Sequence, residues 1–131
     1  MISNSGIDPF YSEVSIRLKI DNRTEDEDIL QNISNVITYL WDPIIKEFPE
    51  IRLNSFYRCE KLNKAVGGKS ESKHLLGQAI DISDYRLSIL LDWVKSNLIY
   101  DELIVYPTYI HISYDINKIP KSDIKINEIP L

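Results

Sequence analysis

NSFYRCEKLNKAVGGKSESKHLLGQAIDIS, residues 54–83, is the stretch that organises this chain. It holds His74, one of two histidines, and Asp81, which follows in an alternating run typical of a strand. The second histidine, His111, lies in another alternating run, YIHISY. Two imidazoles and one carboxylate are the ligand set of a catalytic zinc site, which leaves a fourth position open for water. On spacing alone, the same triple also fits a loop histidine, a strand histidine and a capping carboxylate.

Glycines bracket His74. Gly67 and Gly68 precede it and Gly77 follows it, and these are three of the four glycines in the chain. Glycine reaches backbone conformations that other residues adopt only at a cost. This context indicates a histidine held in place between turns, and it favours the zinc site over three unrelated residues.

The stretch resembles the core motif of the zinc D-alanyl-D-alanine carboxypeptidase and L-alanyl-D-glutamate endopeptidase family, which cuts bacterial cell-wall peptides. Two positions depart from the family pattern: Phe56 replaces the usual glycine and Cys59 the usual serine. The segment Ile20-Asp21-Asn22 is similar to a segment of the phage and prophage branch, and DELIVYPTYIHISY resembles its closing segment. The resemblance covers about residues 10–115. The residues that match the core motif are Ser55, Tyr57, Arg58, Leu62, Asn63, Ala65, Val66, Gly67, Gly68, Ser72, His74, Gly77, Ala79, Asp81 and Ile82.

The resemblance implies roles for five residues. His74, Asp81 and His111 would bind zinc. Arg58 would face the substrate and steady negative charge on the carbonyl under attack, as a fixed cationic donor does. Ser72 would lie near the substrate. The residues themselves leave two alternatives open: Arg58 as the partner of a loop carboxylate, and Ser72 as a plain loop serine.

The expected general base is missing. In the family an acidic residue lies shortly before the third zinc ligand, whereas this chain has Tyr106 there. Tyrosine is a poor base near neutral pH, because its reference pKa is about 10. Three alternatives follow. In the first, another acid serves as the base: Glu102 or Asp101 is nearest in sequence, and Asp115 follows the ligand. In the second, Tyr106 contacts the substrate and acts as a proton shuttle. In the third, the chain binds zinc without cutting peptides, as in the hedgehog signalling domain, which looks like a relative of this fold.

Composition sets broad limits on the chain. Its 131 residues predict a single domain, 1–131, with a core at about 10–115. A net charge of −5 argues against a nucleic-acid partner, and the absence of a long apolar run argues against a membrane span. A lone cysteine, Cys59, cannot form an internal disulfide. No signal peptide is apparent, so we expect the host cytoplasm before release, or a phage virion, as the location.

The apolar pattern predicts an α+β fold with a small antiparallel sheet and two main helices. The first long helix spans about 25–48. It opens with a capping box from Thr24 to Glu27, and Asp42-Pro43 interrupts it with a kink or a restart, with Asp42 as a cap. The other expected elements are a short helix near Pro9 capped by Ser12, a strand at 51–56, a helical turn at 60–66, a strand at 78–83, a helix at 85–97 capped by Ser83 or Asp84, a hairpin of 103–105 and 109–113, and an edge strand or loose tail at 116–131. The resemblance implies the hedgehog/DD-peptidase fold.

Together with the candidate zinc ligands, the resemblance implies a zinc-dependent peptidase that hydrolyses stem peptides of bacterial peptidoglycan and is phage or prophage encoded. The alternative is a catalytically inactive, peptidase-like virion structural or wall-binding protein, with other virion proteins as partners. A third reading is a domain without metal, in which both histidines are structural. The sequence does not choose between carboxypeptidase and endopeptidase action.

Overall fold

The computed structural model describes residues 7–11, 13–118 and 123–126. No helix in these ranges is both long and apolar enough to cross a membrane. The α+β prediction is confirmed. In chain order the elements are α1 (Glu13–Leu18), α2 (Glu27–Val36), the π-helical turn η1 (Ile37–Trp41), α3 (Asp42–Glu47), β1 (Arg52–Ser55), α4 (Glu60–Ala65), the 3₁₀ turn η2 (Lys73–Leu76), β2 (Ala79–Ser83), α5 (Leu87–Asn97), β3 (Glu102–Val105), β4 (Ile110–Ser113) and β5 (Asp123–Ile126).

The five strands form one sheet in the order β1-β2-β4-β3-β5. The first four run antiparallel to their neighbours, as predicted, and β3 and β4 form the expected hairpin. The edge strand expected within 116–131 is β5, but it pairs in parallel with β3. Since β5 runs opposite to β4, the chain leaves β4 and enters β5 at the same end of the sheet.

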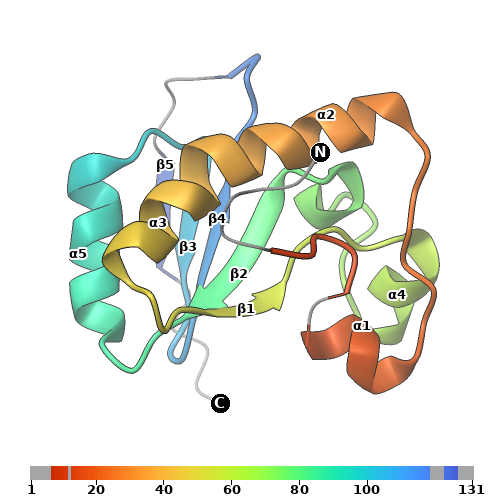
Figure 1. Ribbon diagram of the computed structural model, residues 1–131, viewed down its shortest axis with the longest axis horizontal. Helices are drawn as coiled ribbons and strands as arrows, with labels where there is room; N and C mark the ends of the chain where they lie inside the picture. Colours follow the sequence, from red (N-terminus) through yellow and green to blue (C-terminus); the bar gives the residue numbers. More distant parts are fainter. Residues whose placement is uncertain (1–6, 12, 119–122, 127–131) are drawn as a thin grey trace.

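Helices α2 and α3 form one long rod across the sheet (Figure 1). The apolar stripe predicted for this rod is confirmed. Its buried members are Ile33, Val36, Ile37, Leu40, Trp41, Ile44 and Phe48, with Ile29 and Ile45 partly buried against the same core.

The start of this rod corrects the predicted capping box. The N-cap is Asp26, whose carboxylate accepts from the backbone N–H groups of Asp28 and Ile29. Thr24 instead accepts from the backbone N–H of Asp26. Threonine and aspartate side chains can both cap a helix, but the helical conformation begins only after residue 26, so Asp26 is the N-cap.

Pro43 explains the irregularity inside the rod. The predicted irregularity is present as the π turn η1, in which the N–H of Asp42 donates to the carbonyl of Ile37. Helix α3 then begins at Asp42, but its N-cap is Trp41, so the prediction of Asp42 as the cap is wrong. A proline has no N–H, and its ring collides with a carbonyl of the preceding turn of a regular helix. One wider turn just before Pro43 relieves that collision and keeps the rod continuous.

The other predicted caps are also corrected. Helix α5 begins at Leu87 rather than 85, and no side chain caps it. Asp84 instead accepts from the backbone N–H of Arg86, in a turn before the helix. Helix α1 begins at Glu13, and the predicted cap Ser12 lies outside the described residues.

Alternation along the strands separates two faces of the sheet. The side chains of Leu103, Ile110 and Ile112 are fully buried in the core cluster that also contains the residues of α2 and α3. Their neighbours on the same strands, including His111 and Ile104, are only partly buried and line a cavity. Successive strand residues point to opposite faces, so the helices cover one face and the cavity lies on the other.

Candidate metal centre

Two central strands supply the floor of the site. In the pairing of β2 with β4, Asp81 lies directly opposite His111, and His111 in turn lies opposite Ile104 of β3. Side chains directly opposite each other on one face of an antiparallel pair lie within contact distance. The Asp81 carboxylate oxygen Oδ1 is 2.8 Å from Nδ1 of His111.

His74 reaches this floor from the turn η2. Ser72 caps the turn, since its hydroxyl accepts from the backbone N–H of His74. Gly77 ends the turn with a φ of +72°, a conformation that favours glycine. A Cβ at this position would lie 2.8 Å from a side-chain carbon of Ile33, so η2 packs closely on α2. Gly77 therefore ends the turn that carries His74, as the sequence predicts for the glycine that follows the histidine.

The hydrogen bonds of His74 define its tautomer. Its Nδ1 lies 2.6 Å from the backbone carbonyl oxygen of Phe56, which can only accept, so Nδ1 carries the proton. Its other nitrogen, Nε2, lies 3.1 Å from Oδ1 of Asp81. In a neutral ring this nitrogen presents a lone pair to a carboxylate oxygen, an arrangement that a cation between them would stabilise.

Burial favours the neutral ring. His74 is only 1% exposed, and this burial lowers the pKa of its imidazole below the ordinary 6.5, although Asp81 opposes the shift. Burial alone would raise the pKa of Asp81, but the two imidazoles outweigh it and hold that pKa well below its usual range. The carboxylate and the Nε2 lone pair are thus both available near neutral pH.

The three predicted ligands come together. One ligand atom each from His74, Asp81 and His111 lies within 4.8 Å of the other two. Imidazole and carboxylate are the donors that zinc accepts in catalytic sites, and the backbone carbonyl bonded to His74 is the usual kind of outer partner for a zinc-binding histidine. The donor set therefore fits zinc, the metal that the sequence predicts.

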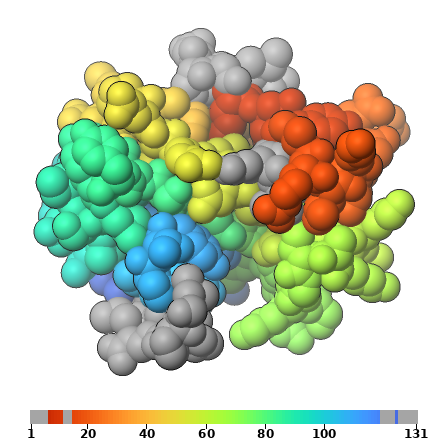
Figure 2. All heavy atoms as spheres, turned by 90° about the horizontal axis from the view of Figure 1, so that it is seen from below, coloured from red at the N-terminus to blue at the C-terminus, as the bar shows by residue number. Residues whose placement is uncertain are grey.

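The ligands lie in a cavity of about 670 Å³. Figure 2 shows the hollow between the segment that follows α4 and the turn between β3 and β4. This volume lies in the range of sites for small molecules and short peptide segments. The lining residues are Arg58, Val66, Gly67, Gly68, Lys69, Glu71, Ser72, Lys73, His74, Asp81, Glu102, Ile104, Tyr106, Tyr109 and His111.

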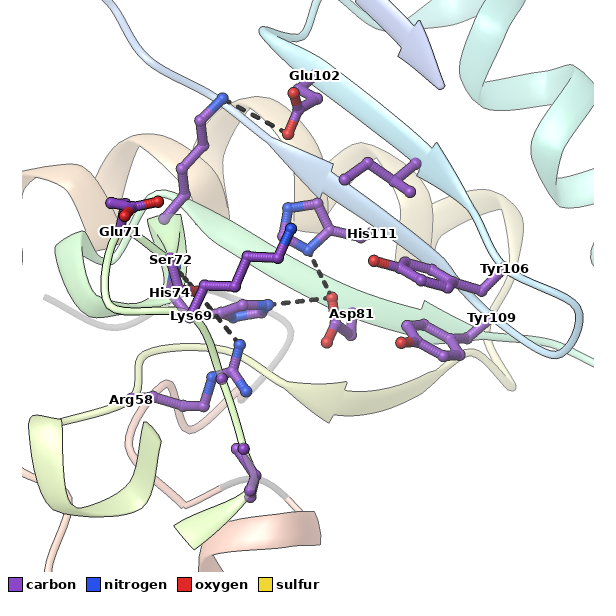
Figure 3. A pocket seen from close by; sticks show the side chains of 15 residues that line it. Arg58, Lys69, Glu71, Ser72, His74, Asp81, Glu102, Tyr106, Tyr109 and His111 are labelled. Carbon is purple, nitrogen blue, oxygen red and sulfur yellow. Dashed lines mark hydrogen bonds and ion pairs between the residues drawn. The ribbon is translucent and has the colours of Figure 1, made fainter. Parts of the chain in front are cut away.

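Arg58 lines the cavity close to the ligands (Figure 3). Its Nη2 donates to the hydroxyl of Ser72 at 3.3 Å, and within the described chain it forms no ion pair with a carboxylate. Burial lowers the pKa of Arg58, with Asp81 and Tyr109 opposing, but a guanidinium stays protonated in proteins. Both Arg58 and Ser72 line the cavity, and Ser72 also links Arg58 to the turn that carries His74.

Of the three acids considered for the missing base, only Glu102 lines the cavity. Asp101 is fully buried and pairs with Lys73 at 2.6 Å. Asp115 accepts from the backbone N–H of Asn117. Glu102 itself lies 3.7 Å from the ammonium group of Lys73.

Along β3 and the turn after it, Glu102 and Tyr106 lie on opposite sides of Ile104, the residue that pairs with His111. Ile104, which pairs with His111, lies midway between them along the chain. Four residues of extended chain span about 13 Å, so the Glu102 side chain starts far from the place that Tyr106 occupies. A carboxylate at 102 approaches the ligands from the other end of the cavity.

Sequence reasoning missed several lining residues, among them Tyr109, Glu71 and Lys73. Tyr109 lies two residues before His111, and the alternation of the strand could have placed it on the same face. It stacks on Tyr106 with ring centroids 4.5 Å apart, and burial raises its pKa to about 12, so it remains an O–H donor. Glu71 and Lys73 belong to a polar loop and a short turn, for which no periodic pattern predicts direction.

A family model described as Peptidase M15 matches residues 14–113. No curated protein matches the chain. The matched segment contains five residues of the site: Arg58, Ser72, His74, Asp81 and His111.

Proposed function

We infer the function from one premise: this chain belongs to the peptidase M15 family, a family of zinc metallopeptidases. We propose that it is a zinc-dependent peptidase that hydrolyses peptide bonds in the stem peptides of bacterial peptidoglycan, and that it is phage or prophage encoded. The observation that carries the proposal is the convergence of three ligand atoms, from His74, Asp81 and His111, in a cavity beside Arg58.

Different groups of the site fit different steps of peptide hydrolysis. Zinc held by the three ligands would supply an acidified water and a Lewis acid. Hydrolysis then requires that a proton moves from water to the leaving amine and that negative charge on the carbonyl oxygen is stabilised. Arg58 is the fixed cation in the cavity wall that fits the second task.

Two acids are the candidates for the proton transfer. Besides Asp81, the acidic side chains that line the cavity in the described residues are Glu102 and Glu71. Glu102 is held on a strand beside Lys73, whereas Glu71 is exposed on the loop before Ser72. We propose Glu102 as the base, because a positioned carboxylate transfers protons better than a mobile one.

The test is mass spectrometry of purified peptidoglycan after incubation with the zinc-loaded protein. New stem-peptide fragments that vanish with Asp81→Asn would establish a peptidase and identify the bond. Glu102→Gln and Glu71→Gln form a matched pair: we expect the first to abolish release and the second to leave it nearly unchanged. The reverse result would assign the base to Glu71.

Tyr106 favours a second candidate function. Where the resembled family has an acid, this chain has a phenol stacked on Tyr109, and Figure 3 shows both rings on the side of the cavity where Asp81 and His111 lie. An inactive virion structural or wall-binding protein would keep zinc and release no fragments. Co-sedimentation of such a protein with insoluble peptidoglycan, together with an unchanged digest, would support this candidate over the peptidase.

A further inference from the structure

Asn22 lies fully buried against the backbone that carries Arg58. Its amide nitrogen Nδ2 donates to the carbonyl oxygen of Tyr57 at 2.6 Å, and its Oδ1 accepts from the backbone N–H of Cys59 at 2.7 Å. The same Nδ2 also donates to the carbonyl of Phe10 at 2.7 Å. One side chain thus bonds the residues on both sides of Arg58 and links them to the N-terminal segment.

The other side of this backbone is bonded to the turn that carries His74. The N–H of Arg58 donates to the carbonyl oxygen of His74 at 3.0 Å. The carbonyl of Phe56 accepts from the His74 ring. Residues 56–59 therefore lie between Asn22 and the metal ligand His74, with hydrogen bonds to both.

The Arg58 side chain is fixed at its far end as well. Its Nη2 is bonded to Ser72, and its Nε is buried. Because a long side chain can swing about its base, the direction of the guanidinium depends on how firmly the backbone at 57–59 is held. Asparagine suits this place because it offers two donors and an acceptor at once; an aspartate would present oxygen to two carbonyl groups.

We propose that Asn22 is a positioning residue for Arg58: it holds the backbone at Tyr57 and Cys59 so that the guanidinium faces the cavity. The proposal rests on the function proposed above only in so far as Arg58 acts on substrate. It also assigns a positioning role to the segment Ile20-Asp21-Asn22, which supplies no ligand to the metal site.

The test compares Asn22→Ala with Ser15→Ala. Ser15 is also fully buried and donates to the carbonyl of Phe10, so Ser15→Ala removes a buried hydrogen bond in the same segment while the bonds of Asn22 to Tyr57 and Cys59 stay in place. We expect Asn22→Ala to lower kcat/KM about 10- to 100-fold, since small misplacements of a catalytic group have effects of this order. Ser15→Ala should leave kcat/KM nearly unchanged. If Asn22→Ala does not fold, Asn22→Ser is the milder change, because its hydroxyl leaves one polar group at the site.

A double variant separates positioning from general damage. In an Arg58→Ala background, Asn22→Ala should cause no further loss of kcat/KM, because the group that it positions is gone. Equal losses in both backgrounds would overturn the proposal and make Asn22 a purely structural residue.

A second readout does not depend on hydrolysis. In protein labelled with ¹⁵N-arginine, the Nε–H signal of Arg58 is identified by its absence in Arg58→Ala. We expect this signal to move toward those of exposed arginines in Asn22→Ala and to stay in place in Ser15→Ala, with zinc content unchanged in both. An unmoved signal in Asn22→Ala would refute the proposal, even if the wild-type protein proves to have no peptidase activity.

Discussion

Zinc should raise the thermal stability of this protein, and Asp81→Asn should remove most of the effect. The three ligand atoms come from η2, β2 and β4 and lie within 4.8 Å of one another only in the folded chain. A ligand that binds only the native state raises the free energy of unfolding by RT ln(1 + [L]/Kd), where [L] is the free ligand concentration. In the metal-free protein, moreover, the Nε2 lone pair of His74 faces a carboxylate oxygen, which zinc would relieve.

The magnitude follows from the size of the chain. At free zinc about 100 times Kd, the stabilisation is about 2.7 kcal/mol. With an unfolding entropy of about 2.1 cal/mol/K per residue, the 131 residues give about 0.28 kcal/mol/K. The expected rise in Tm is therefore about 10 °C.

Differential scanning calorimetry with and without zinc measures this shift. The matched control is Glu71→Gln, which makes the same acid-to-amide change at the rim of the same cavity and should keep the full shift. A shift in Asp81→Asn as large as in the wild type would show that zinc binds elsewhere. No shift in the wild type at saturating zinc would refute the metal centre.

Three further predictions concern single residues. Gly67 and Gly77 both have a φ of +72°, so alanine should cost about 1–2 kcal/mol of stability at each. At Gly77 the added Cβ also collides with Ile33 and Ile29 of α2, so urea titration should show the larger loss of stability for Gly77→Ala. Equal losses for the two variants would contradict this packing of η2 on α2. Burial lowers the pKa of His74 in the folded protein, so as the pH falls His74 takes up its proton in the unfolded chain first. The metal-free protein should therefore lose stability as the pH falls below about 6.5. A urea midpoint that does not change between pH 7 and pH 5.5 would contradict this. Tyr106→Glu places a carboxylate where the resembled family has one. Because we propose that Glu102 already serves as the base, kcat of the zinc-loaded variant should stay nearly unchanged. A rise of about 100-fold or more, the usual range for a general base, would show that Glu102 does not fill that role.

The strands and the long helix were largely predictable, because their patterns are periodic. Alternation places Asp81 and His111 each on one face of its strand, and antiparallel pairing brings them opposite each other. The apolar steps from Ile33 to Phe48 predict a buried helix face, and that face is buried.

The details that were missed depend on contacts between distant segments. The cap of α2 is Asp26 because of where the preceding chain turns, which no local pattern records. The direction of Glu102 is set by Lys73, a residue on another element. The role of Asn22 emerges only when residues 10, 57 and 59 are folded around it.

The two hydrogen bonds between His74 and residues 56–58 have a thermodynamic consequence. At residues 56–58 both bonds use main-chain groups, so no side-chain substitution at Phe56 can remove the acceptor. We therefore expect occupancy of the metal position and occupancy of the arginine by an anion to be linked equilibria. Linkage is reciprocal: whatever factor zinc contributes to the affinity of an anion at Arg58, that anion contributes to the affinity for zinc. A titration of either ligand, repeated in the presence of the other, reports the same coupling constant.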